Sequence, residues 1–276
     1  MSDFEADKNI RELHRACVEG HKDIVNHLLK QKVRASAFDL KGHPPIVVAA
    51  VNGNASCVRL LCENQIRVDQ PTKNSDTALT LVLASFVAAN TMPVPGPFDT
   101  EKHVREDRKR RARNARLEEV VVTLLELGAD PATPRHSGIT PLHIASLSGF
   151  NSAVQLLLSG RYYTITNRGE RVNPSVHAVD ALSRTPLHRA AAKGHGDVAA
   201  TLLRAGADPL ARNSSGMSSL QVGIELGRDV FIKSVMNTWC EEFQPGVHVN
   251  MDEMMQIKPA LQIFEKKIPQ LECLVN

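Results

Sequence analysis

Cysteine and histidine are the residues of this sequence that could bind a metal or act as a nucleophile or base. Five cysteines occur, an odd number, and no two of them form a Cys-x-x-Cys pair. This pattern argues against a disulfide framework and a zinc module and favours free thiols in a reducing compartment. His143 and His188 each stand fourth in the tetrapeptide Thr-Pro-Leu-His, either as a metal ligand or base or as a structural residue. Phosphate-loop, dinucleotide, zincin, nucleophile-elbow and kinase motifs are absent, so we expect no enzyme, no metal and no cofactor.

A basic run, Lys109–Arg113, is the second candidate for chemistry. Residues 99–116 carry eight Lys/Arg and four Asp/Glu, a local charge of +4, whereas the whole chain has a net charge of +3. Such a run could bind an acidic surface or nucleic acid, act as a nuclear-import signal, or be only a solvated helix face. Because the chain as a whole is not a polycation, an acidic protein surface ranks above nucleic acid as the partner.

Both tyrosines of the chain, Tyr162 and Tyr163, lie beside Arg161, Arg168 and Arg171. Tyr and Arg are enriched at the hot spots of protein interfaces. We therefore predict that this segment contributes to a partner site. The alternative is a lengthened hairpin that only packs on its neighbour.

The elements that must position these residues form an internal repeat. The segment TPLHIASLSGF at 140–150 recurs as TPLHRAAAKGH at 185–195, and weaker copies begin at Arg11, Pro44, Thr77 and Ser218. The third residue of each copy is apolar, and the steps from one to the next are 33, 33, 63, 45 and 33 residues. A period of 33 with insertions of 30 and 12 residues accounts for every step.

Each copy predicts a pair of helices. Thr can cap a helix, Pro fits its first turn, and Leu points into the stack. Gly, which tolerates a left-handed turn, then ends the first helix in five of the six copies. Apolar residues at helical spacing after the Gly, such as Val198, Leu202 and Leu203, predict a second amphipathic helix.

This pattern resembles the ankyrin repeat, through TPLH, the Gly-His pair, the paired leucines and Gly-Ala-Asp, over about Lys8 to Met236. The resemblance implies an all-α solenoid of about six helix-turn-helix repeats with short hairpin loops. It also implies that His143 and His188 brace the loops by hydrogen bonding. In ankyrin arrays, partners usually meet the hairpin tips and first helices along a concave face.

Two insertions interrupt the repeats. We expect an ankyrin-repeat domain over residues 1–239, with insertions at about 87–116 and 161–173, and a C-terminal extension over residues 240–276 that caps the array or links to a further domain. No Gly or Pro lies between Asp99 and Leu127, which predicts a helix of roughly 40 Å whose first turns have no apolar face to bury. The segment that follows Gly160 predicts strand, turn and strand.

The function indicated is that of a protein-binding scaffold or adaptor that uses the concave face and the inserted segments. The alternative is a nucleic-acid-associated regulator acting through the basic helix 101–116. No secretory signal or transmembrane run is seen, so we expect a cytosolic or nuclear protein without membrane contact. The candidate partner-binding residues are Leu147, Arg184, Lys193 and Met217 on the concave face, Arg161, Tyr162, Tyr163 and Arg168 in the second insertion, and Lys109, Arg110, Arg111 and Arg113 in the first.

Overall fold

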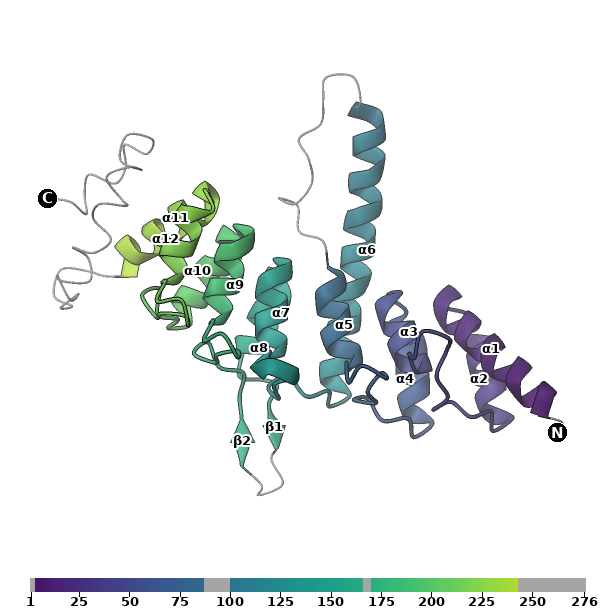
Figure 1. The fold of residues 1–276 in the computed structure, drawn as a ribbon. Helices are drawn as coiled ribbons and strands as arrows, with labels where there is room; N and C mark the ends of the chain where they lie inside the picture. Colours follow the sequence, from purple (N-terminus) through teal and green to yellow (C-terminus); the bar gives the residue numbers. More distant parts are fainter. Residues whose placement is uncertain (1–2, 87–99, 166–169, 243–276) are drawn as a thin grey trace, which may run out of the picture.

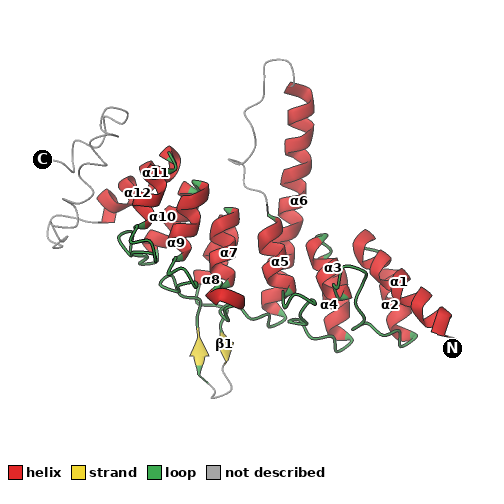
Figure 2. Cartoon of the chain, viewed as in Figure 1, coloured by secondary structure: helices red, strands yellow, loops and turns green. Residues whose placement is uncertain are grey.

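The computed structural model describes residues 3–86, 100–165 and 170–242 of the chain. Twelve α-helices lie in these ranges and follow one another in pairs along an extended array (Figures 1 and 2). The pairs are α1 (Asp3–Glu19) with α2 (Lys22–Lys30), α3 (Pro45–Val51) with α4 (Ala55–Glu63), α5 (Ala78–Ser85) with α6 (Thr100–Glu126), α7 (Pro141–Ser148) with α8 (Asn151–Leu158), α9 (Pro186–Lys193) with α10 (Gly196–Arg204), and α11 (Ser219–Glu225) with α12 (Asp229–Glu242). The expected extension lies outside the described residues from position 243 onward.

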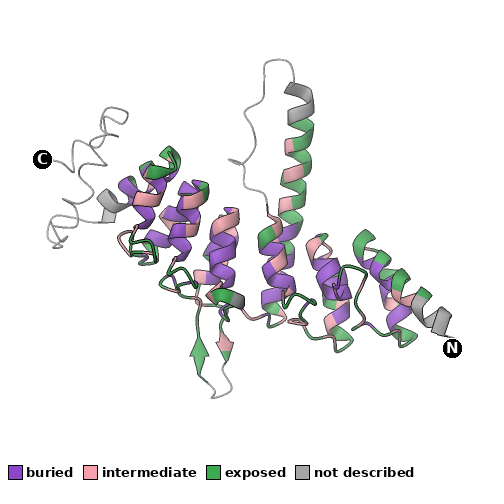
Figure 3. Cartoon of the chain, viewed as in Figure 1, coloured by how far each residue is buried: buried purple, intermediate pink, exposed green. Residues whose placement is uncertain are grey.

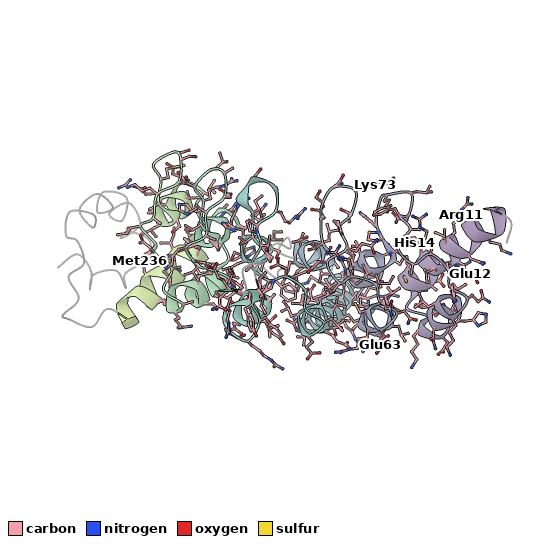
Figure 4. The ribbon with its side chains drawn as sticks, turned by 90° about the horizontal axis from the view of Figure 1, so that it is seen from below. Arg11, Glu12, His14, Glu63, Lys73 and Met236 are labelled. Carbon is pink, nitrogen blue, oxygen red and sulfur yellow. The ribbon has the colours of Figure 1, made fainter. Side chains whose placement is uncertain are left out.

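The helices form two layers. The first helices of successive pairs contact one another from α1 to α11, and the second helices contact one another from α2 to α12. Figure 4 separates these layers: Glu63, at the end of α4, lies on one side of the array and Lys73, in the loop before α5, lies on the other. The all-α repeat fold that the sequence predicts is confirmed, whereas the count of six repeats stays a prediction.

The recurring Thr and His start the first helices as a reciprocal cap. The Thr140 side chain accepts a hydrogen bond from the His143 backbone N–H, and His143 Nδ1 accepts one from the Thr140 N–H at 3.2 Å. Ser218 and Gln221 make the equivalent pair before α11. Two of the four orphan N–H donors of each helix start are satisfied in this way. The helix α7 then ends at Gly149, whose φ of 76° lies in the left-handed region that glycine adopts without strain.

The apolar residue third in each copy of the motif lies in the core. These six side chains are at most 1% exposed and form part of one buried cluster along the array (Figure 3): Leu13, Ile46, Leu79, Leu142, Leu187 and Leu220. Each therefore packs against the residues of the next helix pair, as the period of 33 requires.

Hydrogen bonds join neighbouring loops between the helix pairs. Lys73 N–H donates to Gly42 O at 3.0 Å, Ala181 N–H to Ser137 O at 2.8 Å, and Ser214 N–H to Leu182 O at 3.0 Å. These bonds join the first loop to the second, the third to the fourth and the fourth to the fifth, while the Asp130 N–H donates to the Asp69 side chain at 3.0 Å between the second loop and the third.

The helix α6 has 27 residues and is about three times as long as its neighbours α4 and α8. At 1.5 Å per residue it spans roughly 40 Å, which confirms the predicted long helix. Its C-terminal part carries the buried apolar side chains of Leu117, Val120, Val121, Leu124 and Leu125, while its N-terminal part projects past all other helices (Figures 1 and 3). We call this projecting part, residues 100–116, the arm.

The second insertion forms a hairpin of strands β1 (Thr164–Ile165) and β2 (Arg171–Val172). The strands are antiparallel, with Thr164 opposite Val172 and Ile165 opposite Arg171. The hairpin projects from the opposite side of the array to the arm (Figure 1). Strand, turn and strand were predicted here, and the two strands are confirmed.

Among the described residues, no helix has the length and apolar character needed to cross a membrane.

Candidate protein-binding surfaces

The histidines of the two Thr-Pro-Leu-His copies, His143 and His188, have a structural role. His143 Nε2 donates to Arg184 O at 2.9 Å and His188 Nε2 donates to Met217 O at 3.1 Å, each bond reaching the loop of the next helix pair. His195 Nε2 likewise donates to Leu147 O at 3.1 Å. Burial lowers the pKa of all three imidazoles, so each is held neutral. The ring nitrogens of these histidines thus hydrogen-bond one repeat to the next.

The thiols in the described core are structural as well. Cys17 and Cys57 are buried and Cys62 is half-buried. Burial raises the pKa of Cys17 to about 12 and that of Cys62 to about 11. Because the thiolate is the reactive form, these groups pack as small hydrophobes rather than act as nucleophiles.

A row of small and apolar side chains runs along the outer side of the first-helix layer. It is made by one motif position, two residues before the Gly that ends the first helix or its equivalent. Because the first helices contact one another in order, these side chains follow one another along the array. We call them the apolar row: Val18 and Ala84 are exposed, and Val51, Leu147 and Ala192 are half-buried. Glu225 takes the same position in α11 and ends the row.

The loop before α9 contains a buried carboxylate. The side chain of Asp180 is 1% exposed and pairs with Arg184 at 2.9 Å and with Arg189 at 2.6 Å. Burial alone would raise its pKa, but backbone N–H groups of Arg184 and Leu182 and the two guanidinium groups outweigh burial and lower the pKa to about 2. Arg184, predicted as a partner contact, is therefore already paired within the loop. Arg189 was not predicted, because its pairing depends on a carboxylate nine residues away.

The remaining predicted residues of this face differ in exposure. Lys193 is exposed in the last turn of α9. Met217 is half-buried, with its carbonyl oxygen bound by His188. Leu147 lies in the apolar row on α7, whereas Met217 lies in the loop before α11.

The inserted hairpin separates the two tyrosines. Tyr162 is 9% exposed and belongs to the core, with the Arg161 guanidinium 5.4 Å from its ring centroid. Tyr163 is 42% exposed, and the Arg171 guanidinium lies 3.9 Å from its ring centroid. The Tyr162 ring thus packs in the core and joins the hairpin to the array, while the expected contact of the two tyrosines with a partner stays a prediction. Arg168 lies outside the described residues.

Two apolar residues of the hairpin were missed in the sequence. Ile165 is 65% exposed and lies on the same face of the hairpin as Tyr163, whereas Val172 is 40% exposed and lies on the other face, opposite Thr164. The side chain of Thr164 donates to Asp130, which holds the base of the hairpin against the preceding loop. Short β-branched residues in a predicted strand gave no sign of which side faces water.

The basic residues of the arm differ in their ion pairs with other described side chains. Arg110 and Arg111 both pair with Asp107, Arg111 at 2.7 Å. The side chain of Arg110 is only 13% exposed, so this basic residue is largely shielded from solvent. Lys109 and Arg113 are exposed.

Comparison with known protein families identifies the repeat. The family model for ankyrin repeats (3 copies) matches residues 13–86 and 111–213, more than half of the chain. The chain belongs to the ankyrin repeat family. The matched ranges leave out residues 87–110, which include the first turns of the arm, so this part of the array departs from the family pattern.

Solved ankyrin structures show the same fold. An ankyrin repeat domain from Acinetobacter baumannii AYE superposes with a TM-score of 0.58 at 21% identity, covering 82% of this chain and 96% of that one. A chain in the complex of the predatory endopeptidase Bd0816 of Bdellovibrio bacteriovorus with immunity protein Bd3460 superposes with a TM-score of 0.57 at 18% identity, covering 82% and 97%.

A curated relative is the E3 ubiquitin-protein ligase XBAT33 of Arabidopsis thaliana, which is 29% identical over 150 residues. The match covers 53% of this chain and 22% of the ligase, so the chain spans about a fifth of that relative. Ankyrin repeats are generally protein–protein interaction modules and are typically non-catalytic.

Proposed function

We propose that this ankyrin array is a scaffold or adaptor that holds a partner protein on its first-helix face, without catalysing a reaction. The apolar row carries the proposal. A row of small and apolar residues along a rigid layer favours docking of a preformed surface, since little ordering is needed on binding. Free buried thiols fit a reducing compartment, so a cytosolic or nuclear location is part of the proposal.

The two insertions extend this surface in the proposal. The hairpin adds Tyr163, Ile165 and Val172, whose exposed apolar surface is of the kind found at the centre of interfaces. The arm adds Lys109 and Arg113, which are placed to attract an acidic partner.

Selective loss of a partner tests the proposal. The intact chain and two double variants are used to capture proteins from an extract of the source cells. In the first variant, Ala84→Glu with Leu147→Glu places charge in the apolar row. In the matched control, Ser56→Glu with Gln155→Glu places the same charge on the second helices α4 and α8, at positions that are exposed.

A partner that is captured by the intact chain and the control but lost from the row variant supports the proposal once its binding is reproduced with purified proteins. Thermal unfolding followed by circular dichroism confirms that both variants are folded. If the row variant and the control are both folded and capture the same proteins equally, the first-helix face is not the binding surface.

A further inference from the structure

The arm has two chemically different sides. Asp107, Arg110 and Asn114 are half-buried and lie on one side of α6. Arg105, Lys109, Arg113 and Arg116 are exposed. The latter are spaced by four, four and three residues, which places them within about 80° of one another around the helix axis. We call these four residues the basic stripe; it is about 16 Å long at 1.5 Å per residue.

The basic stripe is not neutralised within the described chain. The carboxylate of Asp107 pairs with Arg110 and Arg111, which do not belong to the stripe. Among the side chains that the structure describes, no carboxylate pairs with any residue of the stripe. Four cations in a line, none paired with a carboxylate among the described side chains, create a local positive potential that an anionic partner can relieve.

The root of the stripe is fixed in position. Gly53, with φ of 80°, lies so close to α6 that a Cβ added there would be 2.8 Å from Cβ of Arg116. At the other end of the buried part, Arg59 of α4 pairs with Glu126 at 2.8 Å. Because α6 is continuous from Thr100 to Glu126, the stripe is held rigidly relative to α3 and α4.

We propose that the basic stripe binds an acidic α-helix of a partner protein, in which Asp or Glu recurs every four residues. Successive charges four residues apart lie about 6 Å apart along any α-helix, so such a partner presents carboxylates in register with Arg105, Lys109 and Arg113. Ala112, which is small and exposed between them, leaves room for close approach. This inference rests on the proposed protein-binding function and names the partner chemistry at one of its surfaces.

Two features favour an acidic helix over nucleic acid. Glu106 and Glu119 are exposed next to the stripe, where they would repel phosphates but can pair with basic residues of a mixed-charge helix. No Phe, Tyr or Trp occurs between Thr100 and Glu126, so the arm offers no aromatic ring on which bases could stack.

Peptide binding by the full chain tests this proposal. The probe is a labelled, Ala-rich helical peptide with Glu at every fourth position; a peptide of the same composition with its Glu residues clustered at one end is the comparison. A duplex and a single-stranded DNA of matched charge are titrated in parallel. Dissociation constants are measured by fluorescence anisotropy at low and at moderate salt.

Two double variants with the same loss of charge distinguish the stripe from net charge. Lys109→Gln with Arg113→Gln removes two cations of the stripe, whereas Arg108→Gln with Arg111→Gln removes two exposed cations that lie roughly 100–160° away from them around the helix axis. We expect the spaced peptide to bind about fivefold more weakly to the stripe variant, and less than about twofold more weakly to the control. Circular dichroism checks that both retain their helices.

Equal weakening by the two variants, equal binding of the spaced and clustered peptides, or no binding of the spaced peptide overturns the proposal. Tighter binding of either DNA, lost in the stripe variant, overturns it in favour of nucleic acid. These results leave the first-helix face untouched, because the Ala84 and Leu147 variant tests that surface separately.

Discussion

The two insertions of this array reach away from it in opposite directions and are attached in different ways. The arm is a continuation of α6 and has no fully buried apolar side chain among its described residues; the first one in α6 is Leu117. The hairpin begins with a buried ring, Tyr162, and is tied to the array by the Thr164–Asp130 hydrogen bond. A helix satisfies its own backbone and can extend alone, whereas two strands of two residues each need an anchor. The comparison therefore predicts that the arm can be altered freely beyond its root and the hairpin cannot be altered at its base.

The largest effect is expected at the root of the arm. Leu117 is fully buried, whereas Val104 is 69% exposed. Leu117→Ala should lower the free energy of unfolding by about 2–5 kcal/mol, and Val104→Ala should change it by less than about 0.5 kcal/mol. Urea denaturation measures both. Similar losses for the two variants would mean that the arm packs on the array along its length.

The second-largest loss of stability is expected at the base of the hairpin. Tyr162→Ala removes most of a buried ring and should cost about 2–3 kcal/mol. Tyr163→Ala removes an exposed ring stacked on Arg171 and should cost less than about 1 kcal/mol. The same denaturation experiment applies. If the two tyrosines cost the same, the hairpin is not anchored through Tyr162.

Low pH should lower the stability of the repeats that flank the hairpin. Burial lowers the pKa of His143, His188 and His195. The unfolded chain binds these protons near pH 6.5 and the folded chain only at lower pH, so the unfolded state holds more protons in between. The free energy of unfolding should therefore fall as the pH decreases below about 6.5, and should not fall for this reason above it.

A Gln variant of these caps is the control, because Gln221 already occupies the equivalent position before α11. His143→Gln with His188→Gln should flatten the dependence of stability on pH between about 5 and 7, even if the variant is less stable throughout. Melting temperatures measured across this range decide the point, and an unchanged slope would assign the acid sensitivity to other groups.

The smallest effect on folding is expected at the basic stripe. Lys109 and Arg113 are exposed on a helix, and Ala is a good helix former. Lys109→Ala with Arg113→Ala should change the free energy of unfolding by less than about 0.5 kcal/mol, as measured by urea denaturation. A loss above 1 kcal/mol would show that the stripe packs on the array.

The sequence predicted the repeat and its core because one position of the motif points into the stack in every copy. The spacing of Leu142 and Leu187, with the missing helix breakers before Leu127, was enough to place the helix pairs and the long α6. The orientation of neighbouring side chains was not predictable. Tyr162 and Tyr163 lie on opposite sides of an extended chain, and only the contact with the array decides which one is buried.

Which basic residues form ion pairs could not be predicted from the sequence either. All four basic residues of the Lys109–Arg113 run looked equivalent, but Asp107 pairs with Arg110 and Arg111, whereas Lys109 and Arg113 have no carboxylate partner among the described side chains. Rotation around the helix determines this division, and it requires the position of α6 relative to the array. Arg189 was missed for a similar reason, since its partner Asp180 lies in the loop before the helix.

The unbroken course of α6 has a consequence for avidity. No flexible linker separates the end of the arm from the repeat core, so the distance between a ligand on the arm and a ligand on the array is nearly constant. A partner whose own two contact sites match that distance would bind its second site at high effective concentration. A partner with another spacing would gain nothing from the second site. The length of one helix would thus act as a ruler that selects among partners with similar individual contacts.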